Sequence, residues 1–433
     1  MDFNPSPEVA QLRERVLDFM DAEIYPQERE IMEALDEEVG AGVPYPENLV
    51  AVREKAKTEG LWNLFMPDER FGPGLTNWEY GLLCEEMGRS PMAAPMAFNC
   101  SAPDTGNMEI LAEHGTAEQR ERWLEPLLEG RIHSCFSMTE PEVSGSDPTL
   151  LQARAWLDGD EWVVDGHKWF TSGAVGADLA IAMVVTDPDA PPYSRASMIC
   201  VPTDTPGFNL VRPISVMGHD GGPGHCEIRY EECRVPRVFL LGERGAGFAI
   251  AQDRLGPGRI HHCMRAIGTA ERAHEMMCRR ANERSAFGGP LGDKQFVQES
   301  IAASRMEIDQ ARLLTLYAAW KMDTEGASAA RREIALIKFF GAQVLHDVVD
   351  RALQIHGSLG YSTDMPLEAM YRFARGARFY DGPDEVHRQS VARFILRGYE
   401  PPADGVPSEH VPTRREAARE KFAHLLEAVT SND

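Results

Sequence analysis

The residue pattern changes twice along the 433 residues of this chain, and these two changes limit the folds that it can adopt. Residues 7–132 carry apolar side chains at three- and four-residue steps, as in Val9–Phe19, which is typical of helices with one buried face. Residues 133–246 are richer in Gly, Pro and β-forming residues, and helical spacing returns from residue 247 onward. This order predicts an α+β fold that is mainly α, because a doubly wound sheet would need strands and helices in alternation.

The middle region predicts several short strands. Glu161–Phe170 predicts two strands around a tight turn at Asp165-Gly166. Leu179–Thr186 and Ser197–Val201 predict buried strands, and His225–Val235 predicts a further strand with loose alternation.

The C-terminal region predicts a long helix, because apolar residues step evenly from Ile334 to Ile355 and Gly357 follows as a natural C-cap. Residues 401–411 are rich in Pro and polar residues and predict a linker, and Arg414–Val429 predicts a terminal helix. We therefore expect four segments: an N-terminal α-helical domain (1–132), a central β-domain (133–246), a C-terminal helical domain (247–400), and a linker with a terminal helix (401–433).

Composition excludes several classes of partner. The formal net charge of -24 repels DNA and anionic lipid, and the chain has no dense block of Lys and Arg, so we expect no nucleic acid. No apolar run reaches the roughly 18 residues of a membrane span, so we expect no membrane insertion. The eight cysteines form no CxxC pair, which predicts neither a disulfide framework nor a metal site. The acidic N-terminal stretch resembles neither a signal nor a transit peptide, so we expect a reducing, cytoplasmic compartment.

The run Phe379–Arg388 sets the carboxylate of Asp381 on a Gly382-Pro383 turn just before a predicted helix. A carboxylate held on a rigid turn can act as a base toward a substrate lodged there. The same residue could simply cap the helix, because Asp accepts the first N–H groups and Pro fits the first turn. Taken alone, the run is more typical of a cap.

Two segments of the β region could hold a ligand. Phe136–Pro141 and Ser144–Asp147 offer hydroxyls and backbone N–H groups to a flat heteroaromatic ring or to phosphates, although they could form an ordinary Ser/Thr-rich turn. His167–Gly173 places Trp169 near Thr171, so the indole could stack on a ring while the hydroxyl bonds its edge. A core Trp with a turn Thr is the simpler alternative.

Three segments of the helical region carry further polar signals. Gly256–Arg259 predicts the start of a helix whose Arg could hold a phosphate or a polarised acyl group. The following pair, His261 and His262, points to different helix faces and cannot easily share a metal, so we predict a surface or interface role. Arg284–Gly288 with Gln295 could grip a pyrophosphate and stack on a base. Gln354–Tyr361 runs from a helix end into a Gly-rich turn, for which a simple C-cap is the alternative.

The order of these segments resembles the acyl-CoA dehydrogenase family over roughly residues 7–400. The resemblance rests on Thr-Glu-Pro…Gly-Ser-Asp, Trp-x-Thr-x-Gly, Arg-x-x-Phe-Gly, Gln-Ile-x-Gly-x-x-Gly and the final Tyr-Asp-Gly-Pro-Asp-Glu-Val-His-Arg. It is closest to the subgroup of the vertebrate eleventh-member type, which shares Asn99–Asn107, Arg254–His262 and Asp381–His387. The family fold implies an N-terminal helical domain, a central small β-sandwich or barrel, and a C-terminal four-helix bundle.

The resemblance also implies an activity: FAD-dependent α,β-dehydrogenation of an acyl-CoA thioester to a 2-enoyl-CoA, as in fatty acid β-oxidation. Asp381 would remove the α-proton while the β-hydrogen leaves as hydride to flavin N5. Electron-transfer flavoprotein would accept the electrons, and the chain would form a homodimer or homotetramer. Burial against flavin and acyl chain would raise the pKa of Asp381 toward a more useful basicity. A flavin oxidase or monooxygenase on the same fold, and a nucleic-acid-binding relative, are the alternatives.

The resemblance implies roles for individual residues of this chain. The matches on the FAD side are Phe136, Met138, Thr139, Gly145, Ser146, Trp169, Thr171, Arg284, Phe287, Gln295, Gln354, Gly357, Pro383 and Glu385. The matches on the substrate side are Ser146, Arg259, Tyr380 and Gly382. Asp104 and Asn107 would border the acyl pocket, where they could contact a hydroxylated or otherwise polar acyl chain. They could instead face solvent or cap a helix.

Two departures from the family pattern stand out. Asp381 is one methylene shorter than the Glu of the medium-chain branch, so the turn must lie closer to the substrate or the substrate must sit deeper. The loop Pro141–Ser146 is one residue longer than the common form, which could reshape the mouth of the site.

Overall fold

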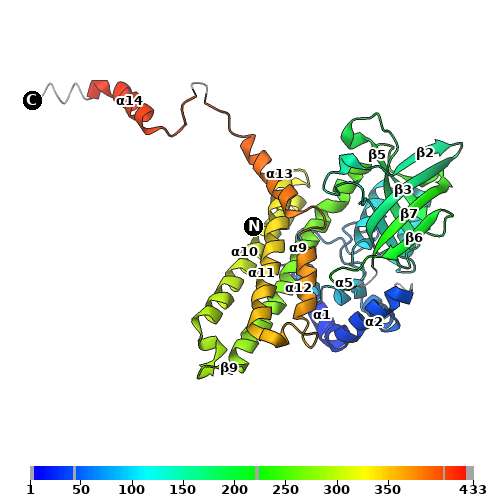
Figure 1. The fold of residues 1–433 in the computed structure, drawn as a ribbon, viewed down its shortest axis with the longest axis horizontal. Coiled ribbons are helices and arrows are strands. Elements are labelled where there is room, and N and C mark those ends of the chain that lie inside the picture. The colour runs from blue at the N-terminus through cyan, green and yellow to red at the C-terminus, as the bar shows by residue number, and fades with distance from the viewer. Residues whose placement is uncertain (1–3, 42–44, 220–223, 403–404, 426–433) are drawn as a thin grey trace, which may run out of the picture. The chain divides into compact units, whose positions relative to one another are not determined.

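The computed structural model of the chain describes residues 4–41, 45–219, 224–402 and 405–425. By compactness the chain divides into two units, residues 1–388 and residues 389–433. The first unit runs from N-terminal helices through a mixed sheet to a set of long C-terminal helices (Figure 1). This order confirms the expected α+β class, whereas the division into four segments stays a proposal.

The N-terminal helices begin where side chains can satisfy their first N–H groups. Ser6 accepts from the amide of Val9 at 3.2 Å, and Thr76 and Glu79 form a capping box. The helices are α1 (Pro7–Phe19), α2 (Glu28–Ala41), α3 (Glu47–Thr58), α4 (Asn77–Gly88), α5 (Ala93–Ala97), α6 (Asp104–His114), α7 (Ala117–Gln119) and α8 (Glu125–Leu128). Two π-helical turns, Met20–Ile24 and Arg120–Leu124, follow α1 and α7.

The strands of the middle region form one 8-stranded sheet in the order β6-β7-β3-β2-β4-β5-β8, with β1 added beside β4. The β1–β4 pair is parallel and the β4–β5 pair is antiparallel. The strands are β1 (Ser134–Ser137), β2 (Arg154–Asp158), β3 (Glu161–Ser172), β4 (Leu179–Val185), β5 (Ala196–Pro202), β6 (Phe208–Pro213), β7 (His225–Pro236) and β8 (Leu240–Leu241). The strands predicted at Leu179–Thr186, Ser197–Val201 and His225–Val235 are confirmed.

The turn predicted at Asp165-Gly166 is wrong, because β3 continues through it. The pairing of β3 with β7 shifts register between Val164 and Gly166, which marks an irregularity inside the strand. A Cβ on Gly166 would lie only 2.3 Å from the Cβ of Ala153. Glycine is therefore required there by the close approach of a neighbouring segment rather than by a change of chain direction.

Long helices follow the sheet and pack on one another. They are α9 (Gly247–Glu283), α10 (Gln295–Glu325) and α11 (Arg331–His356), with the shorter α12 (Leu367–Gly376) against α9 and α11 and α13 (Asp384–Leu396) after it. The two-stranded hairpin β9 (Ser285–Ala286) and β10 (Gly289–Pro290) joins α9 to α10 (Figure 1). The helix predicted from Ile334 to Ile355 is confirmed, and Gly357 ends it at φ +65°.

The predicted helix start at Gly256 is wrong. Helix α9 begins at Gly247, and Pro257 lies inside it. Ile250 and Ala251 are buried, so apolar packing favours a helix that starts before the proline. Because α9 extends in both directions past this point, Arg254, Arg259 and His262 all lie on one continuous helix.

The second unit contains the end of α13 and helix α14 (Val411–Lys421). The terminal helix predicted over Arg414–Val429 is present as α14, which starts three residues earlier, at Val411. Residues 426–429 of that prediction lie outside the described residues, as do residues 403–404 of the predicted linker. None of the helices within the described ranges combines the length and the apolar character that crossing a membrane would take.

Candidate active site

Asp381 lies in the turn between α12 and α13 with an unusual backbone conformation. Its φ is +54° and that of Gly382 is +100°. Its carbonyl oxygen accepts two hydrogen bonds, from Nε of Arg259 at 3.0 Å and from Nε2 of His387 at 3.1 Å. Asp adopts such a φ more readily than most residues other than Gly, and these two donors fix the peptide further.

The carboxylate of Asp381 points to α9 rather than to the helix that follows it. Oδ2 lies 3.0 Å from Nε2 of His262, and the side chain is 18% exposed. Helix α13 begins at Asp384, so Pro383 occupies the position just before the helix. These positions favour a largely buried, positioned carboxylate over a helix cap.

The charges around Asp381 keep its carboxylate ionised. Burial would raise the pKa of Asp381, but the contact with Nε2 of His262 and the charges of Arg254 and Lys338 outweigh burial and hold the pKa well below its ordinary value. The pKa of Asp381 is therefore lowered by the protein's own groups, and the rise expected from burial against flavin and acyl chain stays a prediction. Burial in turn lowers the pKa of Lys338 and of Arg259, so these cations lie in a poorly solvated site.

Of the surface or interface role predicted for the histidine pair, the surface role is wrong for His261, and the interface role stays a prediction. His261 is buried, with its ring edge-on to Tyr80 at 4.7 Å between centroids. His262 contacts Asp381, and its ring centroid lies 5.0 Å from that of Tyr380. The two rings do face different sides of α9, but His261 is buried and the His262 side chain is only 21% exposed.

Three residues at this site were not identified as site residues from the sequence: His262, Lys338 and His387. A signal did exist for Lys338, which interrupts the apolar stripe of α11 four residues after Ile334. It is buried, donates to the carbonyl of Ala377 at 2.7 Å, and lies 4.9 Å from the ring centroid of Tyr380. A lysine at a core position of a helix needs such partners.

A second cluster of predicted residues surrounds the end of β1 and the loop after it. The amide of Trp169 donates to the carbonyl of Thr139 at 3.0 Å, which joins the loop to β3. A Cβ on Gly145 would lie 2.9 Å from Cγ2 of Thr139, so the loop folds closely on itself. Ser146 is exposed and shares a 2.8 Å hydrogen bond with Ser144.

A buried ion pair holds the loop that follows β1. Nζ of Lys168 lies 2.8 Å from Oε1 of Glu140, and both side chains are buried. Lys168 also donates to the carbonyl of Met138 at 2.8 Å, while Glu140 accepts from the amides of Gln152 and Ala153. The pair thus ties the backbone at Met138 to the segment at Gln152 and Ala153.

Trp169 and Thr171 differ in what they offer a ligand. Trp169 is half-buried next to the exposed Phe170, with a ring separation of 5.2 Å. Thr171 is fully buried, and its hydroxyl lies 3.1 Å from that of Ser137. The structure therefore supports Trp169 as a ring contact more strongly than Thr171.

The predicted residues for the distal end of a cofactor lie on the hairpin after α9 and near the ends of α11 and α13. Phe287 at the hairpin is 98% exposed and Phe296 on α10 is 90% exposed. The other residues of this set are exposed or half-buried: Arg284, Gln295, Gln354, Gly357, Pro383 and Glu385. The hairpin and the start of α10 thus each expose a phenylalanine ring.

Asp104 and Asn107 are both buried, so the prediction that they could face solvent is wrong. Asp104 accepts from the amide of Ser134 at 2.8 Å, and Asn107 donates to the hydroxyl of the same serine at 2.9 Å. Asn107 also accepts from Nε of Arg254 at 3.1 Å. The hydrogen bonds of both side chains join α6 to β1 and α9. Few of their donors and acceptors therefore remain free to bind a polar acyl chain.

The guanidinium of Arg254 bridges the two clusters. Its carbon lies 4.2 Å from the ring centroid of Phe136, and it is one of the charges that lower the pKa of Asp381. Arg254 on α9 thus lies next to Phe136 of the predicted flavin-binding residues and acts electrostatically on Asp381, the predicted base.

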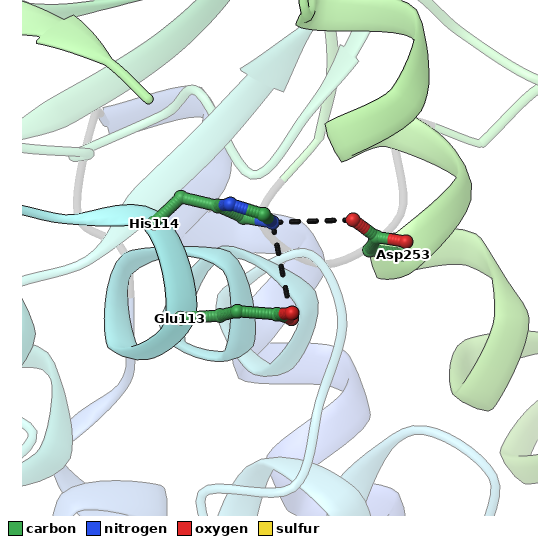
Figure 2. Close-up of side chains that lie close together, drawn as sticks. All are labelled: Glu113, His114 and Asp253. Carbon is green, nitrogen blue, oxygen red and sulfur yellow. Dashed lines mark hydrogen bonds and ion pairs between the residues drawn. The ribbon is translucent and has the colours of Figure 1, made fainter. Parts of the chain in front are cut away.

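One further cluster could in principle hold a cation, although the sequence predicted no metal. Glu113, His114 and Asp253 place one ligand atom each within 4.8 Å of one another, where α6 ends beside α9 (Figure 2). Nε2 of His114 lies 3.2 Å from Asp253 and 3.8 Å from Glu113. Both carboxylates are exposed, and the contacts are those of a surface ion pair.

A cavity of about 470 Å³ lies elsewhere, among α1, α4, α9 and α10. Its lining is entirely charged, and the charges pair with one another, as in Arg13–Glu86, Arg312–Glu85 and Arg305–Glu271. It is an interhelical charge network and contains none of the predicted site residues.

The chain matches a known protein family along most of its length. Three models of one family match the chain in succession: the acyl-CoA dehydrogenase N-terminal domain over residues 6–131, the middle domain over residues 135–233 and the C-terminal domain over residues 245–396. The chain therefore belongs to the acyl-CoA dehydrogenase family, whose members are oxidoreductases and FAD-binding flavoproteins. The expected fold and family are confirmed.

Individual relatives agree with this assignment. The chain is 49% identical to FadE2 of Mycobacterium tuberculosis over 92% of this chain and 97% of that protein. It is 45% identical to human acyl-CoA dehydrogenase family member 11 over 88% of this chain, but it spans only 50% of that longer protein. The predicted closeness to the eleventh-member subgroup is thus confirmed.

Solved structures show the same fold. A structure from Mycobacterium abscessus described as an acyl-CoA dehydrogenase is 46% identical, with a TM-score of 0.88 over 92% of this chain and all of that one. A chain described with the electron-transferring flavoprotein of Acidaminococcus fermentans is 28% identical, with a TM-score of 0.80 over 92% of this chain and all of that one.

Proposed function

We propose that this protein is an FAD-dependent acyl-CoA dehydrogenase that converts an acyl-CoA thioester to a 2-enoyl-CoA, with Asp381 as the base that removes the α-proton. The observation that carries the proposal is the placement of Asp381: an ionised, partly exposed carboxylate on a turn clamped through its own carbonyl. A general base must be deprotonated and held near the proton that it takes.

The residues of the β1 loop fit a flavin. Ser144 and Ser146 offer exposed hydroxyls, the adjoining backbone offers N–H groups, and the half-buried Trp169 offers an aromatic face beside them. Such a donor set suits a flat heteroaromatic ring with polar edges. In the proposal Phe136, Met138, Thr139 and Gly145 line the same ring. FAD, when bound, would supply the acceptor for the β-hydrogen.

The residues around Asp381 would handle the acyl-CoA. Asp381 takes the α-proton, and its backbone N–H is the proposed donor to the thioester oxygen as negative charge develops there. Tyr380 and Gly382 flank the base, and Arg259 fixes the peptide that carries it. Ser146 at the loop mouth is the proposed contact to the thioester end of the ligand.

Partners and setting are part of the proposal. The exposed Phe287 and Phe296 support a homodimer or homotetramer in which Arg284, Phe287 and Gln295 of one subunit reach the distal end of FAD in another. Gln354, Gly357, Pro383 and Glu385 are the proposed contacts to the nucleotide portion. Electron-transfer flavoprotein is the proposed electron acceptor. A reducing, cytoplasmic setting fits eight cysteines that are all unpaired in the described residues.

The test is anaerobic bleaching of the purified flavoprotein by a panel of acyl-CoAs that vary in length, branching and hydroxylation. At least one member should reduce the flavin, and Asp381→Asn should retain FAD while reduction slows by about a thousandfold, within the range of general-base contributions. Asn is a suitable replacement because it tolerates a positive φ. A flavin that no acyl-CoA bleaches, or an unchanged rate in Asp381→Asn, would refute the proposal.

A further inference from the structure

His262 is held between a cation and the carboxylate of Asp381. Its Nδ1 lies 3.0 Å from a terminal nitrogen of Arg265, and its Nε2 lies 3.0 Å from Oδ2 of Asp381. A guanidinium carries only donors, so Nδ1 of His262 must accept and cannot hold a proton. A neutral imidazole then carries its single proton on Nε2, where it donates to Asp381.

We propose that His262, oriented by Arg265, is a positioning residue that fixes the carboxylate of Asp381 and assigns the incoming α-proton to Oδ1. The inference rests on the proposed function of Asp381 as the base. Oδ2 is occupied as an acceptor from Nε2, so Oδ1 is the oxygen that remains for the substrate.

The support behind His262 is rigid. Arg265 is buried, and it donates through its other terminal nitrogen to the carbonyl of Cys100 at 3.4 Å. A Cβ on Gly88 would lie 2.2 Å from the carbonyl oxygen of Arg265, so α4 and α9 touch there. A rigidly supported donor suits a short acid such as Asp, because one methylene less leaves it less reach and makes its exact orientation matter more.

His262 remains neutral because of its surroundings. Burial lowers its pKa, and the positive charges of Arg265 and Lys338 lower it further, while Asp381 acts in the opposite direction. The charged or titratable groups that face Asp381 come from three other elements: Arg254, Arg259 and His262 on α9, Lys338 on α11, and His387 on α13. Protonation of Nδ1 would break the contact with Arg265, so His262 is a fixed donor rather than a second base.

The proton step balances without a change at His262. The α-carbon–hydrogen bond breaks, an O–H bond forms at Oδ1, and the electron pair stays on the α-carbon and spreads onto the thioester carbonyl. The carboxylate becomes a neutral acid whose Oδ2 still accepts from Nε2. His262 keeps its own proton throughout.

Two substitutions separate positioning from packing. His262→Phe keeps the ring and its contact with Tyr380 but removes the donor, whereas His262→Gln alters the shape but keeps an amide N–H at the distance of Nε2. We expect the rate constant of anaerobic flavin reduction by acyl-CoA to fall between tenfold and a hundredfold in His262→Phe, about the effect of a hydrogen bond to a charged group. Recovery to within about fivefold is expected in His262→Gln, with FAD content and substrate affinity nearly unchanged in both.

The pH profile and the imidazole itself give independent readouts. In His262→Phe the acid limb of the reduction rate should move to higher pH, because Asp381 loses a donor that stabilises its charged form. Nitrogen-15 spectra of the wild-type holoenzyme, with the His262 signals assigned by their loss in His262→Gln, should show a neutral Nε2–H tautomer at pH 7. His114→Gln, at a surface ion pair, is the control that should change none of these measurements.

The outcomes distinguish this inference from the proposed function. Suppose that acyl-CoA reduces the wild-type flavin but not that of Asp381→Asn. The positioning role is then refuted, and the base retained, if His262→Phe is reduced as fast as wild type. The same holds if His262→Gln is reduced more slowly than His262→Phe. A charged His262 or an Nδ1–H tautomer at pH 7 also refutes it. If no acyl-CoA reduces the wild-type flavin, the proposed function fails and the inference falls with it.

Discussion

The side chain of Arg259 donates from Nε to the backbone carbonyl oxygen of Asp381 at 3.0 Å, and so ties the middle of α9 to a turn more than a hundred residues later. The contact acts on the peptide that carries the carboxylate and not on the carboxylate itself. It therefore holds the φ of +54° at Asp381 without competing for the oxygens that would take a proton.

Replacing Arg259 by Met keeps the apolar stem and removes the donor. We expect flavin reduction to slow by roughly tenfold to a hundredfold, because the turn loses one of its two clamps, with FAD retained. Stopped-flow reduction by an acyl-CoA that bleaches wild type is the measurement. Arg234→Met, at an exposed pair on β7, is the matched control. Equal rates in Arg259→Met and wild type would show that the clamp is dispensable.

Gly382→Ala tests the strain in the same turn. Gly382 has a φ of +100°, and a Cβ there would lie 2.7 Å from Nε2 of His387. Gly159 also has a positive φ, +64°, but a Cβ there would meet nothing within 4 Å. We expect Gly382→Ala to cost about 2–4 kcal/mol in the free energy of unfolding and Gly159→Ala about 1 kcal/mol, since only the first adds a clash to the backbone cost.

Urea denaturation of both glycine variants gives the comparison. Equal losses would mean that His387 yields to the new methyl group. In that case the clamp on the carbonyl of Asp381 is softer than the structure indicates.

The buried pair Lys168–Glu140 should control both stability and flavin retention. Lys168→Met leaves the Glu140 carboxylate buried without its cation, so we expect a loss of about 3–5 kcal/mol in the free energy of unfolding. Because the same lysine donates to the carbonyl of Met138, the purified variant should also carry less FAD. Adding Glu140→Gln should recover part of the stability, since it removes the stranded charge. A double variant less stable than Lys168→Met would contradict this account.

His387 should make the protein less stable as pH falls below neutrality. Burial lowers the pKa of His387 to about 4, whereas an unfolded histidine titrates near 6.5. Between these values the unfolded chain binds a proton that the folded chain does not, so the stabilisation present above about pH 6.5 is lost progressively down to about pH 4. The full change is roughly 3 kcal/mol.

The measurement is the free energy of unfolding of wild type and His387→Gln at several pH values. The difference between the two curves should vary between pH 4 and pH 6.5 and be flat above that range. A constant difference would mean that His387 titrates normally in the folded protein.

The exposed phenylalanine of the β9–β10 hairpin should be needed for assembly. Phe287→Asp places a charge on a side chain that is 98% exposed in the single chain, so the fold should tolerate it. If a partner subunit covers this surface, the change should weaken association at least tenfold and lower the FAD content. Light scattering after size-exclusion chromatography checks this, with Val238→Asp, also exposed, as the control. An unchanged oligomer would place the subunit contact elsewhere.

The sequence by itself determined the class, the family and most of the elements. Periodicity in Val9–Phe19 and Ile334–Ile355 predicted helices that the structure contains, because the spacing of apolar residues directly reflects which face is buried. The ordered motifs identified Asp381 as the leading acid, although alone it was more typical of a cap.

Only the tertiary structure decided how Asp381 is held and charged. Its clamps come from Arg259 and His387, its hydrogen-bond donor from His262, and part of its charge environment from Lys338, and these residues meet only when α9, α11 and α13 pack together. The same limit explains the two local errors at Gly166 and Gly256. In a sequence, a glycine is typical of a turn or of a helix start. The close approach of Ala153 to Gly166 and the burial of Ile250 arise only when the chain folds. Local spacing encodes which face of an element is buried, but the pKa and the orientation of a side chain depend on the atoms that folding brings against it.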